Sequence, residues 1–181
     1  RFARDLAITS GPPTWSSAIP TVKAGECVAS DAAVMINKQV VLEEFTFNAT
    51  QDGGLKTIGT WLAANALPLG AEYAYWRTQL PNQLVLLSDD AFRDFTQFAT
   101  EVQTHIKIDQ DKKTVQDGAL WMEEYLPTDT LMYSLLCATP SRNGVALDAK
   151  AVLKKVKELN LTRMQLGGDE TTGHGIVAVR M

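Results

Sequence analysis

The order of elements predicted towards the end of the chain restricts the fold most. An apolar run over 130–138 predicts a strand, and apolar residues at helical spacing over 148–159 predict a helix. Two short strands follow at 163–166 and 176–180, joined by a glycine-rich connection. The order strand, helix, strand, strand is half of a ferredoxin-like split βαβ unit, so we predict an α+β fold.

Earlier in the chain, two segments have the pattern of strands. Residues 34–49 are extended in pattern, with a possible hairpin turn at Asn37-Lys38. The run from Leu84 to Leu87 is fully apolar and of strand length, and Ser88 after it can cap the next helix. These strands add to the β content of the predicted α+β fold.

Helices are predicted where apolar residues recur every three or four positions. Proline has no N–H for a helical hydrogen bond, so we expect Gly11-Pro12-Pro13 to end the first helix and Pro81 to end the third. The four segments with this spacing are 1–9, 55–67, 71–80 and 91–98.

Between the helices and the closing elements lies a segment with the pattern of a two-stranded ribbon. Residues 102–108 alternate between apolar and polar side chains, which is typical of a strand with one face of each kind. Turn-forming residues follow at 110–113 and again at 116–118. We therefore expect one or two projecting hairpins between 100 and 126.

Composition excludes several classes of protein. The 181 residues are 45% hydrophobic and carry a net charge of −4, as in a folded domain and unlike a disordered chain. No apolar stretch approaches the roughly 18 residues that a bilayer span needs. Cys27 and Cys137 are the only cysteines, so we expect no disulfide framework or zinc site and a reducing, cytoplasmic setting. Residues 1–7 have helical spacing instead of signal-peptide zones, so we expect the sequence to start inside a larger protein.

The glycine-rich connection is the segment most able to bind a ligand. Gly167, Gly168, Gly173 and Gly175 fall within nine residues, which lets a backbone approach a ligand closely and expose several N–H groups, an arrangement that suits phosphate. The spacing is neither that of a Walker A loop nor that of a dinucleotide-binding fingerprint. The alternative is a glycine-rich hairpin with no ligand.

The acidic residues and the histidine of this connection bear on whether it can bind phosphate. Asp169 and Glu170 repel phosphate unless they face a base, a hydroxyl or a metal ion. His174 can stack on a base or bond to it, and the alternative is an exposed polar residue in a tight turn. A net charge of −4 argues against binding bulk nucleic acid by charge alone but permits a local site.

The predicted hairpin carries cations and a large aromatic residue. Lys112 and Lys113 can contact phosphates, and Trp121 can contact base faces, as single-stranded nucleic acid requires. The alternative is a solvated loop with Trp121 in the core. His105 lies on the polar side of the ribbon, with no orienting carboxylate evident in the sequence. The basic cluster over 150–163 is explained by a solvated helix face.

Seven segments, in one order along the chain, carry a resemblance to a known family: 1–7, 41–45, 88–95, 100–104, 118–127, 129–131 and 167–175. They resemble the backbone subunit of type III-B (Cmr) CRISPR RNA-silencing complexes, within the RAMP superfamily. The resemblance implies an incomplete ferredoxin-like (RRM-type) RAMP fold, with inserted helices at about 51–99 and a projecting thumb hairpin at about 104–126. Residues 1–181 would be the C-terminal portion of one RAMP domain.

The resemblance also implies an RNA site. In the family, the glycine-rich loop lies against the guide RNA and the thumb pushes between bases, while several copies stack along one CRISPR RNA. His105 stands where the family is expected to have arginine, and His174 where a basic residue is usual, so both departures weaken the expected phosphate contacts. The RNA-binding residues carried over are Gly167, Gly168, Thr171, Thr172, Gly173, His174, Gly175, His105, Lys112, Lys113 and Trp121.

Catalysis is not assigned to any residue of this chain. The family subunit cuts target RNA with a divalent metal ion such as Mg²⁺, through an aspartate in its N-terminal half, and this sequence begins beyond that region. We expect an antiviral RNA-binding subunit whose partners are guide RNA, target RNA, copies of itself and other subunits of the complex, and no membrane. Two alternatives remain open: a metal-dependent phosphoesterase using Asp169 and Glu170, and a partner-binding module without nucleic acid.

Overall fold

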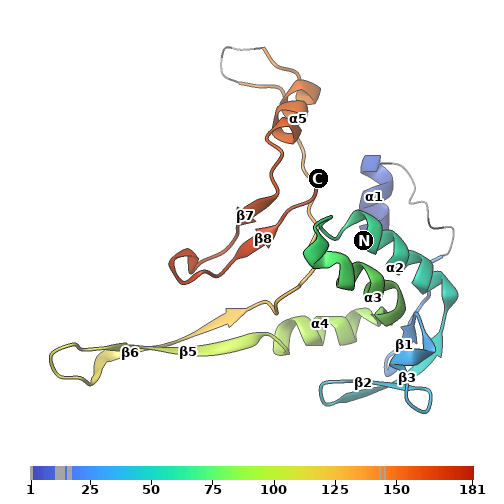
Figure 1. Cartoon of the computed structure of the whole chain (residues 1–181), viewed down its shortest axis with the longest axis horizontal. Helices are drawn as coiled ribbons and strands as arrows, with labels where there is room; N and C mark the ends of the chain where they lie inside the picture. Colours follow the sequence, from blue (N-terminus) through green and yellow to red (C-terminus); the bar gives the residue numbers. More distant parts are fainter. Residues whose placement is uncertain (1, 11–14, 16–17, 143, 145) are drawn as a thin grey trace.

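A four-stranded sheet built by the first half of the chain is the centre of the fold (Figure 1). The computed structural model describes residues 2–10, 15, 18–142, 144 and 146–181. In the sheet, β1 pairs in parallel with β3 and antiparallel with β4, while β2 pairs antiparallel with β3. The strands, in spatial order, are β2 (Gln39–Leu42), β3 (Phe45–Gln51), β1 (Glu26–Ala29) and β4 (Val85–Leu87).

Successive residues of β1 point to opposite faces of this sheet and so supply two separate cores. Val28 packs with Leu55 and Ile58 of α2 (Gly53–Asn65). Cys27 lies in the other core with Phe47, and α4 (Asp89–Phe98) covers that face through Ala91 and Phe95. Burying one such side chain contributes about 1.5–3 kcal/mol, so both faces of the sheet are stabilised.

The N-terminal helix joins the first of these cores. Helix α1 (Phe2–Ser10) contributes Phe2 and Leu6, and Trp15 is buried in the same cluster. The rings of Trp15 and Trp61 meet edge to face, with centroids 4.9 Å apart. The predicted stop at 11–13 lies outside the described residues.

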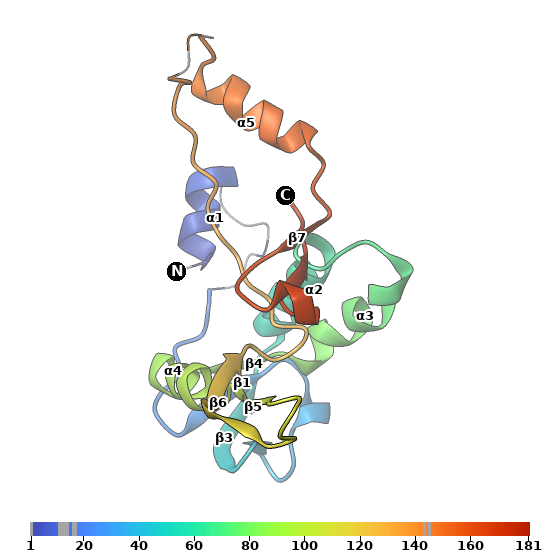
Figure 2. The same cartoon turned by 90° about the vertical axis from the view of Figure 1, so that its left-hand side faces the viewer.

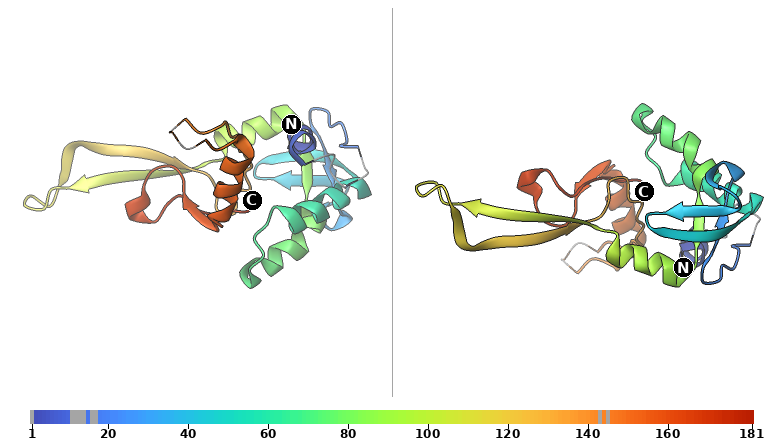
Figure 3. Two further views of the ribbon diagram at one scale, coloured as in Figure 1. Left: turned by 90° about the horizontal axis from the view of Figure 1, so that it is seen from above. Right: turned by 90° about the horizontal axis from the view of Figure 1, so that it is seen from below.

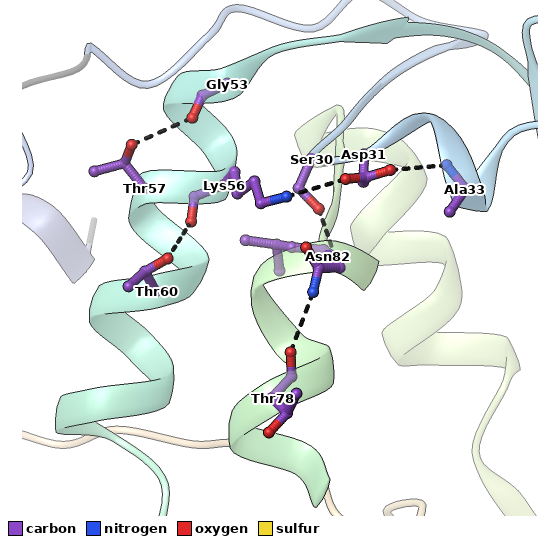
Figure 4. Close-up of polar contacts among 10 residues, drawn as sticks. Ser30, Asp31, Ala33, Gly53, Lys56, Thr57, Thr60, Thr78 and Asn82 are labelled. Atoms are coloured by element: carbon purple, nitrogen blue, oxygen red, sulfur yellow. Dashed lines mark hydrogen bonds and ion pairs between the residues drawn. The ribbon is translucent and has the colours of Figure 1, made fainter.

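Side-chain caps fix where the helices start. Asp52, Ser88 and Asp148 each accept a hydrogen bond from a backbone N–H in the first turn of α2, α4 and α5 (Ala149–Glu158). Asp31 does the same for the short 3-10 helix η1 (Ala32–Val34), and its carboxylate also pairs with Lys56 at 3.1 Å (Figure 4). The hydrogen bond from the Ala33 N–H, followed by the contact with Lys56, lowers the pKa of Asp31.

The prediction that Pro81 ends a helix is wrong. Helix α3 (Ala74–Gln83), which follows the 3-10 helix η2 (Ala71–Tyr73), continues two residues past this proline. A Cβ at Gly59 of α2 would lie 2.9 Å from the Pro81 Cα, so the two helices pack closely here. The segment 51–99 thus holds α2, α3 and α4, and also β4, which belongs to the sheet.

The strands of the sheet differ from the predicted pattern in two places. The hairpin of β2 and β3 turns at Glu43, which has a φ of 51°, whereas Asn37 and Lys38 form a smaller turn closed by one bridge between Ile36 and Gln39. The central strand β1 was not predicted at all.

A long hairpin projects away from the sheet and its helices (Figures 1 and 3). It consists of β5 (Glu101–Ile108) and β6 (Val115–Tyr125), paired antiparallel. The Asp109 carboxylate accepts from the N–H groups of Asp111 and Lys112 and so shapes the tip. The second predicted turn, at 116–118, is wrong: the ladder register shifts between Ile106 and Ile108, and Gly118 lies in β6 with a φ of 74°.

The predicted strand over 130–138 is wrong. No ladder in the described part of the chain includes these residues, and β7 (Arg163–Gln165) pairs only with β8 (Ile176–Ala178). An apolar run forms a strand only where a neighbouring edge offers backbone partners. Instead, the segment runs past α1, where the Tyr133 hydroxyl donates to Asp5 at 3.1 Å.

The last part of the chain, which holds α5, β7 and β8, lies outside the four-stranded sheet. Figure 2 shows α5 at a distance from the sheet, with β7 and β8 between them. Among the described residues, no helix combines the length and apolar character required to span a bilayer. The predicted α+β class is confirmed, because helices and strands mix throughout the chain.

Candidate nucleic-acid interface

The glycine-rich loop between β7 and β8 is exposed at Gly167, Gly168 and Gly173. Gly167 and Gly173 have φ values of 83° and 86°, in the left-handed region that favours glycine. A Cβ placed at Gly167, Gly168 or Gly173 would meet no atom within 4 Å, so the space over these residues is open. A Cβ at Gly175 would lie 2.0 Å from the Leu166 carbonyl oxygen, so that glycine serves the closure of the loop itself.

Hydrogen bonds within the loop use part of its backbone. The N–H groups of Thr172 and His174 both donate to the Asp169 carbonyl, and the Gly173 N–H donates to Glu170, so these amides are not available to a ligand. In the described part of the chain, the N–H groups of Gly167 and Gly168 donate to no acceptor. The N–H groups of Gly167 and Gly168, at the start of the loop, are therefore available as hydrogen-bond donors to a ligand.

Side chains also hold the loop in shape. The Gln165 amide nitrogen donates to the carbonyls of Gly168 and His174, at 3.2 and 3.1 Å. The hydroxyl of Thr172 donates to the Asp169 carbonyl and lies 2.9 Å from Nδ1 of His174. Thr171 is exposed on the short 3-10 helix η3 (Glu170–Thr172).

The base of the hairpin meets this loop through two stacked rings. Tyr125, the last residue of β6, lies on the His174 imidazole with ring centroids 4.3 Å apart and planes 19° from parallel. Further along the hairpin, His105 stacks on Trp121, with centroids 5.6 Å apart and planes at 18°. The loop and one face of the hairpin thus form a continuous surface.

A carboxylate connects the side chains of this face. Glu123 Oε1 accepts from the Trp121 indole N–H at 2.6 Å, and Oε2 accepts from the Tyr125 hydroxyl. These hydrogen bonds, that from Tyr125 first, lower the pKa of Glu123, and the same contact raises the pKa of Tyr125. His105 Nε2 lies 3.2 Å from Glu123 Oε2, at ion-pair distance but outside hydrogen-bond alignment, so a carboxylate does face this histidine.

The structure gathers some of the predicted RNA-binding residues and separates others. Trp121, His105 and His174 lie along the face just described, together with the glycine-rich loop. Lys112 and Lys113 are exposed in the turn at the tip of the hairpin, at the end remote from Tyr125. Trp121 is 43% exposed and is therefore not in the core.

Sequence reasoning missed Glu123 and Tyr125. Their spacing of two residues, continued to Trp121, places all three side chains on one face of β6, and this alternation was the available signal. The contact of Tyr125 with a loop distant in sequence could not be derived from any local pattern.

The described residues do not fit a metal site. Among them, no three His, Cys, Asp or Glu side chains come close enough to hold an ion. Asp169 acts electrostatically on Tyr125 instead. We therefore derive no catalytic step through a metal ion for this chain.

Comparison with known proteins finds similarity to subunits of CRISPR Cmr complexes. The chain is 36% identical, over its whole length and 58% of the relative's, to the CRISPR system Cmr endoribonuclease Cmr4 of Pyrococcus furiosus. Crystalline oligomeric Cmr4 from the same organism has a TM-score of 0.61 at 23% identity, covering 98% of this chain and 59% of that one. A type III-B Cmr-beta complex bound to cognate target RNA gives a TM-score of 0.54 at 26% identity, covering 87% of this chain and 46% of that one.

These comparisons agree with the resemblance inferred from the sequence. The chain spans less than two thirds of the length of each of these relatives. The family model described as the RAMP superfamily matches residues 12–178, which is nearly the whole chain. The chain therefore belongs to the RAMP superfamily.

Proposed function

We propose that this chain is the C-terminal portion of an RNA-binding backbone subunit of a type III-B CRISPR effector complex. The observation that carries the proposal is the open glycine-rich loop, with unbonded amides at Gly167 and Gly168, beside the stacked rings of Tyr125 and His174. Amides suit phosphate and ring faces suit bases, which is the combination that single-stranded RNA requires. The similarity to Cmr4 along the whole chain supports the same function.

In this proposal the guide RNA lies over the loop and the hairpin is the thumb. Residues 104–126 would push between bases of the guide and target strands, with Trp121 on the face that also holds His105. The strands β7 and β8 and helix α5 would belong to a ferredoxin-like palm, which the remainder of the RAMP domain completes. The helices within 51–99 would be an insertion into that domain.

Several copies of the subunit would share one guide strand. Each copy offers a modest contact, because the chain carries a net charge of −4. Binding along a common strand raises the effective concentration of every further contact, which offsets the weak attraction of one copy. The partners in this proposal are guide RNA, target RNA, further copies and the other subunits, in the cytoplasm.

Cleavage of target RNA belongs in this proposal to the complete protein. The relative from Pyrococcus furiosus is named an endoribonuclease. A divalent metal ion such as Mg²⁺ would supply that chemistry. No residue of this chain is assigned to it, and among the residues that the structure describes, Asp169 and Glu170 belong to no group that could hold a metal ion for a separate phosphoesterase.

Sequencing the small RNAs that copurify with the protein from its native source tests the proposal. We expect RNAs of one length class that carry CRISPR repeat sequence. Purified protein that carries no RNA, or RNA without such repeats, would contradict the proposal and favour a protein-binding module.

A further inference from the structure

One side chain on the hairpin holds together the polar face that leads to the glycine-rich loop. The carboxylate of Glu123 accepts hydrogen bonds from the Trp121 indole and the Tyr125 hydroxyl, and it faces the imidazole of His105. Hydrogen bonds to an ionised acceptor are roughly twice as strong as those between neutral groups. The Glu123 side chain is 24% exposed, so solvent competes only partly for it.

The hydrogen bond between Glu123 and Tyr125 affects residues outside the hairpin, because Tyr125 contacts the glycine-rich loop. A tyrosine whose hydroxyl is fixed at one point can no longer swing its ring freely. That ring stacks on the imidazole of His174. The Nδ1 atom of His174 in turn lies 2.9 Å from the hydroxyl of Thr172. The chain of contacts therefore runs from Glu123 through Tyr125 and His174 into the loop.

The stack of Tyr125 on His174 is the ring contact between the hairpin and the loop. The loop's own hydrogen bonds, such as those of Gln165, shape it internally but do not place it against β6. The loop carboxyl of Asp169 also acts on this part of the hairpin, because its charge and its hydrogen bond raise the pKa of Tyr125 and its hydrogen bond with Glu123 lowers the pKa of that carboxyl. The side chain of Asp169 thus forms hydrogen bonds with Tyr125 and Glu123, so this carboxyl and the stacked rings together join the loop to the hairpin.

We propose that Glu123 is a positioning residue for RNA binding, which holds Tyr125 against His174 and thereby fixes the glycine-rich loop to the base of the hairpin. The inference rests on the proposed function, since it describes how the RNA-binding loop is oriented. With the contact in place, the loop and the hairpin face bind RNA as one rigid surface. Without it, each part must be ordered when RNA binds.

The test compares Glu123→Gln with Glu124→Gln, a matched control on the opposite, exposed face of the same strand. Nuclear magnetic resonance reports the stack directly, because the Tyr125 ring shifts the signals of the His174 imidazole. We expect this shift to be lost in Glu123→Gln and kept in Glu124→Gln. Tyr125→Phe keeps the ring but lacks the hydroxyl, so it should lose the same shift of the His174 signals. It serves as the second variant if Glu123→Gln folds poorly.

Affinity for labelled single-stranded RNA gives the second measurement. We expect Glu123→Gln to weaken binding about 5- to 20-fold, within the usual range for coupling between sites. In a His174→Ala background the same change should have no further effect, because both variants break one chain of contacts. The inference would be overturned if the losses of RNA affinity in Glu123→Gln and His174→Ala multiply in the double variant. It would also be overturned if the stack of Tyr125 on His174 persists in Glu123→Gln.

Failure of the proposed function gives a different result. If the unchanged protein binds no RNA, the proposed function is contradicted. The imidazole signals would still decide whether Glu123 positions His174.

Discussion

The phenol ring of Tyr125 lies flat on the imidazole of His174, with ring centroids 4.3 Å apart. This contact joins the end of the projecting hairpin to a loop that follows α5 much later in the sequence. It places the two segments most able to contact RNA side by side.

The open glycines of the loop can be tested without disturbing its backbone. Gly168 does not have a positive φ, and a Cβ there meets nothing within 4 Å, so Gly168→Val should fold normally. If RNA lies against this residue, its branched side chain should weaken guide binding about tenfold or more. Fluorescence anisotropy with labelled guide RNA measures this.

The matched variant is Gly173→Val, where a φ of 86° adds backbone strain to the same side chain. It should lower both the thermal stability and the affinity. Unchanged guide affinity in Gly168→Val would count against a close approach of RNA to the loop.

Trp121→Ala should disturb target pairing more than guide binding. The indole is 43% exposed and stacks on His105, which presents a flat surface to a base. Base stacking on an aromatic side chain contributes about 1–3 kcal/mol, so the affinity of the guide-loaded protein for target should fall roughly 5- to 150-fold. Met122→Ala, on the other face of β6, is the control. Equal losses in guide and target binding would refute the assignment of the thumb.

Lys112 and Lys113 at the hairpin tip should act through charge alone. Each phosphate contact on a single strand contributes about 0.7 to the slope of log affinity against log salt concentration. Replacing both lysines with glutamine should therefore reduce that slope by about 1.4. The double variant Lys154→Gln with Lys157→Gln on α5 should leave it unchanged. If the tip variant has the slope of the unchanged protein, the lysines do not contact RNA.

Acid should weaken the contribution of Glu123 to stability. Its pKa in the folded protein lies below the usual 4.5 because Tyr125 and then Trp121 donate to its carboxylate. The unfolded chain binds the proton more readily, so the stabilisation is complete above about pH 4.5 and is lost as pH falls through the folded pKa. Urea unfolding from about pH 7 to about pH 3 should show the wild type and Glu123→Gln converging in acid. A stability difference that stays constant over this range would contradict the hydrogen bonds to Glu123.

Local signals in the sequence were enough to predict α4 and α5, although not the end of α3. Ser88 and Asp148 cap α4 and α5 as short-range hydrogen bonds require, and the apolar spacing behind each cap predicted the rest. The two-stranded hairpin followed in the same way from alternation and turn residues. Such features depend on neighbours in sequence.

Features that depend on distant partners could not be predicted. The strand β1 is four residues long and is fixed by β3 and β4 on either side. The run over 130–138 has the apolar character of a strand, but no edge in the described structure pairs with it. For the same reason, the glycine-rich loop was predicted to be a candidate site while its contact with Tyr125 was not.

Crosslinking of guide RNA to the purified protein by ultraviolet light, followed by mass spectrometry of the attached peptides, tests the central claim most directly. We expect crosslinked nucleotides on the loop 167–175 and on the hairpin face that holds Trp121 and Tyr125. Crosslinks confined to α5 or to the sheet and its helices would contradict the account.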